Sequence, residues 1–545
     1  MRRFGLFVLV VVLALLSFAP VSAQEMAAVE DVEVEWWDEA VWYLLFVRSF
    51  YDSDGDGIGD LQGVIEKLDY LNDGDPTTTD DLGITAIWLM PITDAASYHG
   101  YDTVDYRAID PDYGTLEDFQ ALLAAAHERG IRIVMDLVVN HTSSQHPWFE
   151  ASLAGDPDFV DWYVWAEENP AYIGPWGQRA WYQRAGMWYY APFWSEMPDL
   201  NYDNPEVTAE MFDIAAFWVD EVGVDGFRLD AIKYVVEDEV DGRIILEDAP
   251  INRQWSANLT QYVKQFDPEV MTVGEIWDDT NVVVRYMRDE AVDMAFEFKL
   301  AEAIIASARS GNKREIERRI RSVVASYDYG QWATFTTNHD HPRLLTQLNS
   351  DVGANRVAAT ILLLSQGAPF IYYGEEIGMV GDKPDELIRT PMQWDDTPVT
   401  GGFTTGDPWQ PLTPGFETVT VAAQTDDPDS LLSHYRALSH LRQAHPALTR
   451  GRTEVVESTY RSVLSFLRYT EDEAMLVIIN LDDDETRDFT LTLDESPLRG
   501  LSGVEVLFGE LDAAVPQIDD EGGFEAYVPF DQPMPPHSAV VIRLQ

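Results

Sequence analysis

A chain of 545 residues with 46% hydrophobic side chains is large enough for several domains or one large barrel with appendages, which excludes a small binding module and a disordered chain. Its 95 acidic residues against 36 lysines and arginines give a formal net charge of −59, which repels nucleic acids and anionic lipids and excludes nucleic acid as an expected partner. Because cysteine is absent, disulfides, thiolate metal sites and a cysteine nucleophile are excluded as well.

The N-terminus is typical of an exported protein. Two arginines precede an apolar run over residues 4–18, and a Val-Ser-Ala cleavage site ends at Ala23. That run, at roughly 15 residues, is shorter than the ~20 residues that span a bilayer, so we expect a signal peptide at 1–23 rather than a membrane anchor. An acidic leader follows at 24–40. The mature protein is expected to be secreted, extracellular or periplasmic, free of the membrane and monomeric.

Apolar runs rich in β-branched residues recur along the chain and alternate with amphipathic stretches. The stretches Leu116–Arg129, Val207–Val222, Asn252–Phe266 and Arg356–Leu364 have the three- and four-residue apolar spacing of helices. Strands that alternate with helices predict an α/β fold with a parallel sheet, and eight units predict a closed (β/α)8 TIM barrel. The predicted strands are Val41–Val47, Ile84–Met90, Ile131–Val138, Val224–Leu229, Val270–Gly274, Val292–Phe296, Trp332–Thr337 and Ala368–Tyr373.

Two stretches depart from this alternation. Residues 142–204 show no clear strand–helix unit and are rich in proline, glycine and aromatic residues, which predicts a domain inserted after the third strand. After residue 449, short alternating runs such as Val463–Arg468 and Ala539–Leu544 predict an antiparallel β-sandwich. The predicted organisation is therefore a catalytic barrel at 41–141 and 205–448, an inserted domain at 142–204 and a C-terminal β-sandwich at 449–545.

Polar residues interrupt the C-terminal ends of several predicted strands. The third strand ends in Asp136–His141, the fourth in Gly226–Asp230, the fifth in Glu275 and the seventh in Asn338–Asp340. Such ends meet at one mouth of a barrel, where active sites of this architecture lie. One acidic residue at a strand end is more often a cap or an ion-pair partner. Several carboxylates with an arginine and two histidines at one mouth indicate catalysis.

These four strings resemble, in order and with similar spacing, the signature regions of the α-amylase family of glycoside hydrolases. Further matches lie at Gly83–Pro91, Met197–Asn201 and Gly367–Glu375, so the resemblance extends from about Val41 to the C-terminus. The Met-Pro-Asp-Leu-Asn string at 197–201 is similar to that of family members intermediate between oligo-1,6-glucosidases and neopullulanases, among them secreted bacterial α-amylases. The resemblance implies cleavage of α-1,4-glucosidic bonds in starch and maltooligosaccharides, with an α-glucan as the partner.

The resemblance also implies a role for each polar residue. Asp230 is the expected nucleophile and Glu275 the expected acid/base of a retaining mechanism, which needs two carboxyl groups about 5 Å apart. Arg228 stands two residues before Asp230, on the same side of the strand, and its guanidinium would keep that carboxylate ionised. Asp340 is the third implied catalytic carboxylate. The implied substrate-binding residues are Tyr101, His141, Arg228, His339, His99 and Lys233.

Position 98 bears on where the glucan is cut. Exo-acting α-glucosidase relatives usually have Asp there to hold the terminal sugar, whereas this chain has Tyr98, as starch-cutting amylases often do. Tyr98 and the aromatic-rich insert favour endo action. His146–Phe149 is similar to the exo-acting relatives, which leaves an oligosaccharide α-glucosidase and a cyclomaltodextrin or transglycosylating enzyme as alternatives. A non-catalytic amylase-like binding subunit is the alternative from another class, although such subunits have a damaged acid set.

An acid-rich loop follows the first predicted strand. Acids at alternate positions can wrap hard oxygen ligands around Ca²⁺, the expected cofactor. The loop is not an EF-hand, because the twelfth position from its first aspartate is Gly63 where the bidentate Glu would be. A second site near Asn140 and Asp199 stays open, since Tyr234 stands where many amylases have His. The predicted calcium ligands of the loop are Asp52, Asp54, Asp56, the backbone carbonyl of Ile58, and Asp60.

Lysine is scarce among the basic residues, with six lysines against 30 arginines. A strongly acidic chain repels itself in dilute buffer, and salt screens that repulsion. The large acidic excess with little lysine therefore predicts a protein adapted to high salt.

Overall fold

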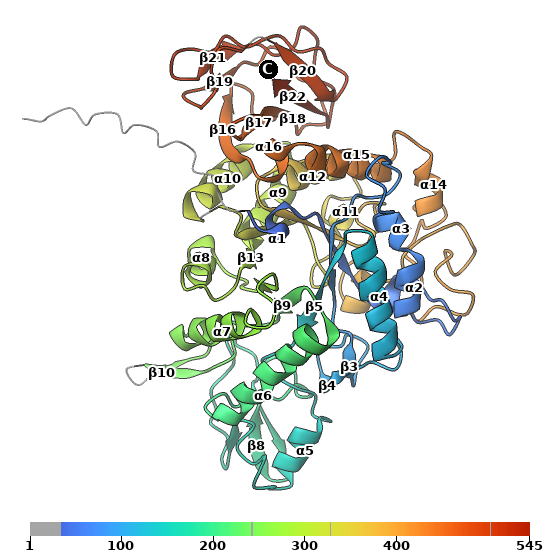
Figure 1. The fold of residues 1–545 in the computed structure, drawn as a ribbon, viewed down its shortest axis with the longest axis vertical. Helices are drawn as coiled ribbons and strands as arrows, with labels where there is room; N and C mark the ends of the chain where they lie inside the picture. Colours follow the sequence, from blue (N-terminus) through green and yellow to red (C-terminus); the bar gives the residue numbers. More distant parts are fainter. Residues whose placement is uncertain (1–33, 241–242, 328, 502) are drawn as a thin grey trace, which may run out of the picture. The chain divides into compact units, whose positions relative to one another are not determined.

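The computed structural model describes residues 34–240, 243–327, 329–501 and 503–545, and its centre is a closed barrel of eight strands (Figure 1). The strands are parallel and follow one another around the barrel in chain order, with the last beside the first. All eight predicted strands are present. They are β1 Trp42–Leu45, β2 Ala86–Leu89, β5 Arg132–Leu137, β9 Gly226–Leu229, β12 Met271–Gly274, β13 Met294–Phe296, β14 Trp332–Phe335 and β15 Ala368–Tyr372.

The four predicted helices are confirmed with shifted ends. They are α4 Leu116–Glu128, α6 Pro205–Ala216, α7 Pro250–Val263 and α12 Val352–Leu364. Thr115 caps α4 through a reciprocal bond pair with Asp118, and α6 continues into the π-helical turn η2, Phe217–Val222. The other helices are η1 Val47–Ser49, α2 Leu61–Glu66, α3 Leu68–Leu71, α8 Thr280–Arg288, α9 Phe298–Ser310, α10 Arg314–Ser326, α11 Leu344–Gln347, α13 Asp385–Ile388, α14 Val421–Thr425, α15 Leu431–Ala444 and α16 Pro446–Thr449.

Aromatic side chains fill the interior of the barrel. Trp88 on β2 packs against Phe296 on β13 with ring centroids 5.2 Å apart, and Phe370 on β15 stacks on Trp42 of β1 at 4.7 Å. These side chains are buried. The barrel is therefore a packed core whose polar residues collect at the C-terminal strand ends.

The predicted insert contains more regular structure than its sequence indicated. It holds helix α5 Pro147–Leu153 and a small antiparallel sheet in the order β6 Trp165–Ala166, β8 Met187–Tyr190, β7 Trp181–Arg184. Phe149 packs between Trp165 and Tyr189, so aromatic contacts supply much of its core. Two hairpins also lie outside the barrel sheet: β3 Thr93–Ala95 with β4 Thr103–Ile109, and β10 Asp238–Val240 with β11 Arg243–Ile245.

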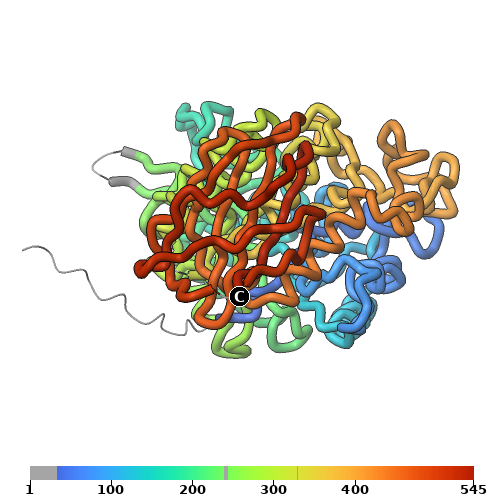
Figure 2. Tube along the Cα trace, turned by 90° about the horizontal axis from the view of Figure 1, so that it is seen from above, coloured from blue at the N-terminus to red at the C-terminus, as the bar shows by residue number. Residues whose placement is uncertain are grey.

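The strands of the C-terminal region pair antiparallel, as predicted, and Figure 2 shows them side by side in orange and red. Residues 452–456 of β16 pair with β17 and residues 457–458 pair with β19, so one strand joins two parts of the sheet around a shared apolar core. The guanidinium of Arg468 donates to the carbonyls of Leu364 and Gly451, which fixes this region to the barrel. Its strands are β16 Arg452–Ser458, β17 Val463–Tyr469, β18 Ala474–Asn480, β19 Leu491–Leu493, β20 Val504–Phe508, β21 Phe524–Tyr527 and β22 Ala539–Leu544.

The predicted signal peptide at 1–23 and the leader up to residue 33 lie outside the described residues. Within the predicted leader, Trp36–Glu39 forms helix α1, and Trp37 is buried there. None of the described helices is long and apolar enough to cross a membrane. The domain boundaries stay predictions.

Candidate active site

Arg228 is the centre of a buried cluster of carboxylates. Its Nη1 donates to Asp136 Oδ1 at 2.9 Å and lies 2.5 Å from Asp230 Oδ1, while Nη2 pairs with Glu275 Oε2 at 2.9 Å. Arg228 is the register partner of Asp136 on β5, and β12, which precedes Glu275, pairs with the other edge of β9. Three neighbouring strands therefore bring the cluster together, as the sequence predicted for Arg228, Asp230 and Glu275.

Asp340 lies beside this cluster and has its own partners. His339 Nε2 is 3.2 Å from Asp340 Oδ2, and Arg389 Nη2 donates to Asp340 Oδ1 at 3.0 Å. The Tyr101 hydroxyl lies 2.7 Å from His339 Nε2 and donates to Asp136 Oδ2 at 3.0 Å. Tyr101 thus connects the two groups of acids into one site.

Burial and neighbouring charges shift the three predicted catalytic carboxyls differently. Burial raises the pKa of Glu275, and although Arg228 lowers it, the negative charges of Asp230 and Asp340 add to the rise. Burial also raises the pKa of Asp230. The charge of Arg228 and its hydrogen bond to Asp230 both oppose that rise. Burial alone would raise the pKa of Asp340, but His339 and Arg389 hold it well below its usual range. Glu275 is thus suited to hold a proton, and Asp340 to stay ionised.

The predicted histidines surround Tyr101. His141 Nε2 lies 3.1 Å from the Tyr101 carbonyl, and His99 Nδ1 accepts a hydrogen bond from the Tyr101 amide at 3.1 Å. Burial lowers the pKa of His99 and of His141 to about 4, and burial also lowers the pKa of His339. All three rings are therefore neutral near pH 7 and can form uncharged hydrogen bonds with a ligand.

Lys233 lies in a different environment from the histidines. It is only 2% exposed, and its Nζ pairs with Asp278 at 2.7 Å and with Glu247 at 3.3 Å. It also donates to the carbonyl of Trp277, two residues after Glu275. Lys233 therefore holds the loop next to Glu275.

Sequence reasoning did not name three residues of this site. Asp136 stood inside a quoted motif but was given no role, although it takes two bonds from Arg228. Trp88 donates to Asp136 at 3.3 Å, and Arg228 lies 5.1 Å above its ring. Arg389 follows α13 and carries no motif or strand-end position, so no sequence signal marks it. Asp136 could have been found from its place at a strand end.

The acid-rich loop forms a compact oxygen cluster. Carboxylate oxygens of Asp52, Asp54 and Asp60 all lie within 4.8 Å of one another. Asp52 is buried and accepts the amides of Gly55 and Gly57 at 2.7 Å. Asp56 lies outside this group, and its Oδ1 accepts the Ile58 amide instead. An all-oxygen donor set of this kind fits a hard cation such as Ca²⁺.

Asn140 and Asp199 are also in contact. Asn140 Nδ2 donates to Asp199 Oδ1 at 3.0 Å, and Asn140 Oδ1 is buried with no hydrogen-bond partner. Burial and the neighbouring Glu237 raise the pKa of Asp199. Tyr234 packs against Trp176 and Phe193.

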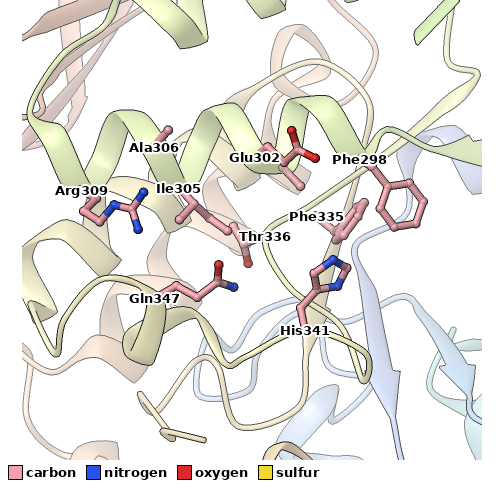
Figure 3. Close-up of a pocket in the computed structure, with 10 residues that line it drawn as sticks. Phe298, Glu302, Ile305, Ala306, Arg309, Phe335, Thr336, His341 and Gln347 are labelled. Carbon is pink, nitrogen blue, oxygen red and sulfur yellow. The ribbon is translucent and has the colours of Figure 1, made fainter. Parts of the chain in front are cut away.

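A cavity of about 230 Å³ lies between α9 and the segment after β14 (Figure 3). His341, which follows Asp340, lines it together with Phe298 and Glu302. Trp277 stacks on Phe298 at 4.9 Å and packs on His341 at 4.7 Å. The cavity therefore adjoins the Glu275 side of the site.

Comparison with known proteins agrees with this geometry. A family model described as the catalytic domain of alpha amylase matches residues 44–451. The chain belongs to the α-amylase family of glycoside hydrolases. It is 41% identical to "Alpha-amylase 3" of Dictyoglomus thermophilum, over 82% of this chain and 85% of that protein. Both the family and the barrel predicted from sequence are confirmed, and the protein is a glycoside hydrolase.

Other members of the α-amylase family resemble the chain along most of its length. It is 33% identical to an oligo-1,6-glucosidase of Heyndrickxia coagulans, over 83% of this chain and 93% of that protein. The crystal structure of the α-amylase from H. orenii superposes with a TM-score of 0.79 at 38% identity, covering 93% of this chain and 100% of that one. These relatives carry different substrate names, so family membership alone leaves the preferred α-glucoside open.

Proposed function

We propose that the protein is an endo-acting α-amylase that hydrolyses α-1,4-glucosidic bonds of starch and maltooligosaccharides with retention. The observation that carries this proposal is that Asp230 and Glu275 share the guanidinium of Arg228. Retention needs carboxyl groups about 5 Å apart, whereas inversion needs roughly 6.5–9.5 Å to admit a water molecule. Two carboxyls on one guanidinium fit the shorter spacing.

In the proposed reaction Asp230 attacks the anomeric carbon while Glu275 gives its proton to the departing glycosidic oxygen. The bond to the leaving sugar breaks as an ester bond to Asp230 forms. Glu275, now a carboxylate, then takes a proton from water, whose oxygen displaces Asp230. Asp340, kept ionised by His339 and Arg389, would bind sugar hydroxyls as the ring distorts.

Exposed aromatic side chains around the site support endo action. Trp176, Trp194 and Trp277 are 54%, 45% and 47% exposed. Trp194 packs edge-on against His99, and Trp176 contacts Tyr234. Exposed rings therefore lie both next to His99 and two residues after Glu275, which suits a long chain better than a single sugar.

A time course on soluble starch tests the endo proposal. We expect iodine staining to fall early, with maltose and longer oligosaccharides as products, because internal cuts shorten chains quickly. Glucose as the only product, with persisting staining, would reject endo action and favour the α-glucosidase alternative that the oligo-1,6-glucosidase relative represents. Products longer than an added maltotriose would favour a transglycosylating enzyme. The same preparation with Asp230→Asn controls for contaminating amylase.

We also propose that the acidic loop binds Ca²⁺ through Asp52, Asp54 and Asp60, with the Ile58 carbonyl as a further ligand. A bound cation would offset the mutual repulsion of these acids and fix the loop. Chelation should lower the melting temperature, and added Ca²⁺ should restore it, because a ligand that binds only the folded state stabilises it, by about 2.7 kcal/mol at 100 times its Kd.

Variants distinguish this loop from other acidic turns. Asp54→Ala should abolish the calcium-dependent rise in melting temperature. Asp75→Ala, which removes an exposed aspartate that also caps a local turn, should leave that rise intact. A full calcium response in Asp54→Ala would show that the cation binds elsewhere.

Given the signal peptide predicted at 1–23, we propose that the enzyme acts outside the cytoplasm on external starch.

A further inference from the structure

Ala231, the residue after Asp230, has an unusual backbone conformation for an alanine. Its φ is +52°, in the left-handed region that side chains other than glycine rarely adopt. The residue is buried in the turn that follows β9, where its carbonyl accepts the Tyr234 amide at 2.9 Å. A left-handed alanine destabilises the fold, and residues strained in this way gather at functional sites. The conformation of Ala231 therefore points to a role beyond the turn itself.

The amide of Ala231 is directed at the carboxyl group of Glu275. It donates to Glu275 Oε2 at 3.2 Å, and Arg228 Nη2 pairs with the same oxygen at 2.9 Å. Glu275 Oε1 accepts no hydrogen bond from any residue that the structure describes, and the side chain is 17% exposed. The two oxygens of this carboxyl group thus have different surroundings.

Two N–H donors on one oxygen decide where the proton of a neutral carboxyl group lies. A carboxyl oxygen has two lone pairs, and Arg228 and Ala231 take up both on Oε2, so a hydrogen there would oppose two other hydrogens. We propose that Ala231 is a positioning residue whose backbone amide, together with Arg228, keeps the acidic proton of Glu275 on Oε1, the oxygen that meets the glycosidic bond. This inference rests on the proposed function, because it takes Glu275 as the acid.

The proton and the charge of Glu275 are then separated between its two oxygens. As the glycosidic bond breaks, its electron pair goes to the departing oxygen, which takes the proton from Oε1. The negative charge left on the carboxylate is stabilised by the two donors at Oε2. When Glu275 later takes a proton from water, the same donors direct that proton back to Oε1.

Charged and titratable groups face Glu275 from several elements. They are Arg228 and Asp230 at the end of β9, Tyr234 in the following turn, and Asp340 after β14. The two aspartates add to the rise that burial causes in the pKa of Glu275, and the arginine opposes it. A change to a single backbone amide leaves all of these groups in place, so its effect on the pKa can be measured separately.

Replacing Ala231 by lactate tests the role of the amide, because the resulting ester lacks the N–H and keeps the side chain. A donor to a carboxylate favours the charged form, so its loss should raise the pKa of Glu275. The basic limb of kcat/KM against pH on maltopentaose, which reports loss of the acid's proton, should move up by about one pH unit. Ala231→Gly keeps the N–H and accepts a positive φ, so its basic limb should stay in place.

Ala171 offers a matched control in the inserted segment. It is also a left-handed alanine, with a φ of +61°, and its amide donates to Asn169 Oδ1 at 2.9 Å. Replacing Ala171 by lactate removes an equivalent hydrogen bond far along the chain from Glu275 and should leave the pH profile unchanged. An unmoved basic limb in the folded enzyme with lactate at 231 would overturn the proposal.

Neutron diffraction from crystals of the parent enzyme tests the same point without a variant. At a pH below the basic limb, a deuteron should be found on Oε1 of Glu275, and a deuteron on Oε2 would overturn the proposal even if the lactate enzyme does not fold. A basic limb that persists in the residual maltopentaose activity of Glu275→Gln would instead overturn Glu275 as the acid. The failure of the positioning role and the failure of the proposed function are therefore distinguishable.

Discussion

Replacing Asp230 by asparagine should lower kcat by at least about 10⁴-fold and leave the melting temperature nearly unchanged. An amide is a far weaker nucleophile than a carboxylate, yet it has the same volume and still offers an oxygen to Arg228 Nη1. Steady-state rates on maltopentaose with a thermal melt would measure both quantities. Asp81→Asn, at a buried aspartate bonded to His440 far along the chain, should keep kcat.

Glu275→Gln separates the two carboxyl roles. On maltopentaose, kcat of this variant should fall as far as it does in Asp230→Asn. On α-glucosyl fluoride much of the parent enzyme's rate should return, because fluoride leaves without a proton. Asp230→Asn should recover nothing on that substrate. Recovery in Asp230→Asn and none in Glu275→Gln would reverse the assignment of nucleophile and acid.

Replacing Arg228 by methionine should destabilise the fold by about 3–5 kcal/mol near neutral pH. The change leaves Asp136, Asp230 and Glu275 buried without their shared cation. Urea unfolding at two pH values would measure the loss. Arg318→Met, at an exposed helix pair with Glu315, should leave the free energy of unfolding nearly unchanged.

The pH dependence of that loss has a definite sign. Burial already raises the pKa of Asp230 and Glu275, and removing Arg228 raises both further. A carboxyl whose pKa is raised in the folded state does not oppose folding below its unfolded pKa, because it is protonated in both states there. As the pH rises through the folded-state pKa, the folded protein has to bury its charge, and this lowers the free energy of unfolding. The Arg228→Met penalty should therefore be larger at pH 8 than at pH 5. An equal penalty at both would show that lost packing, rather than charge, dominates.

The barrel could be predicted because its signals are local. Buried parallel strands are continuous apolar runs, and each run is short and separated from the next by an amphipathic helix. The two-residue spacing of Arg228 and Asp230 likewise predicted that both side chains point to the same side of the chain at the end of β9. The 2.5 Å contact between them confirms this. Strand-end positions were enough to bring Glu275 to the same guanidinium.

Contacts between residues on long loops could not be predicted, because no local sequence pattern marks them. Arg389 reaches Asp340 from 49 residues away, and nothing around it is periodic. Trp409 packs on Tyr98 from a segment, 403–409, whose backbone is hydrogen-bonded to the acidic loop. The alternate spacing of aspartates likewise could not show that Asp56 turns away from the oxygen cluster, since that depends on the positive φ of Gly55 and Gly57.

The anomeric configuration of the first product tests the retaining mechanism at Asp230 and Glu275 most directly. Proton NMR during the first minutes of maltopentaose hydrolysis, at enzyme levels high enough to outrun mutarotation, distinguishes the two anomers at the new reducing end. Attack by Asp230 followed by attack of water inverts the centre twice, so the α-anomer should accumulate first. Initial accumulation of the β-anomer would mean a single displacement by water and would contradict Asp230 as the nucleophile.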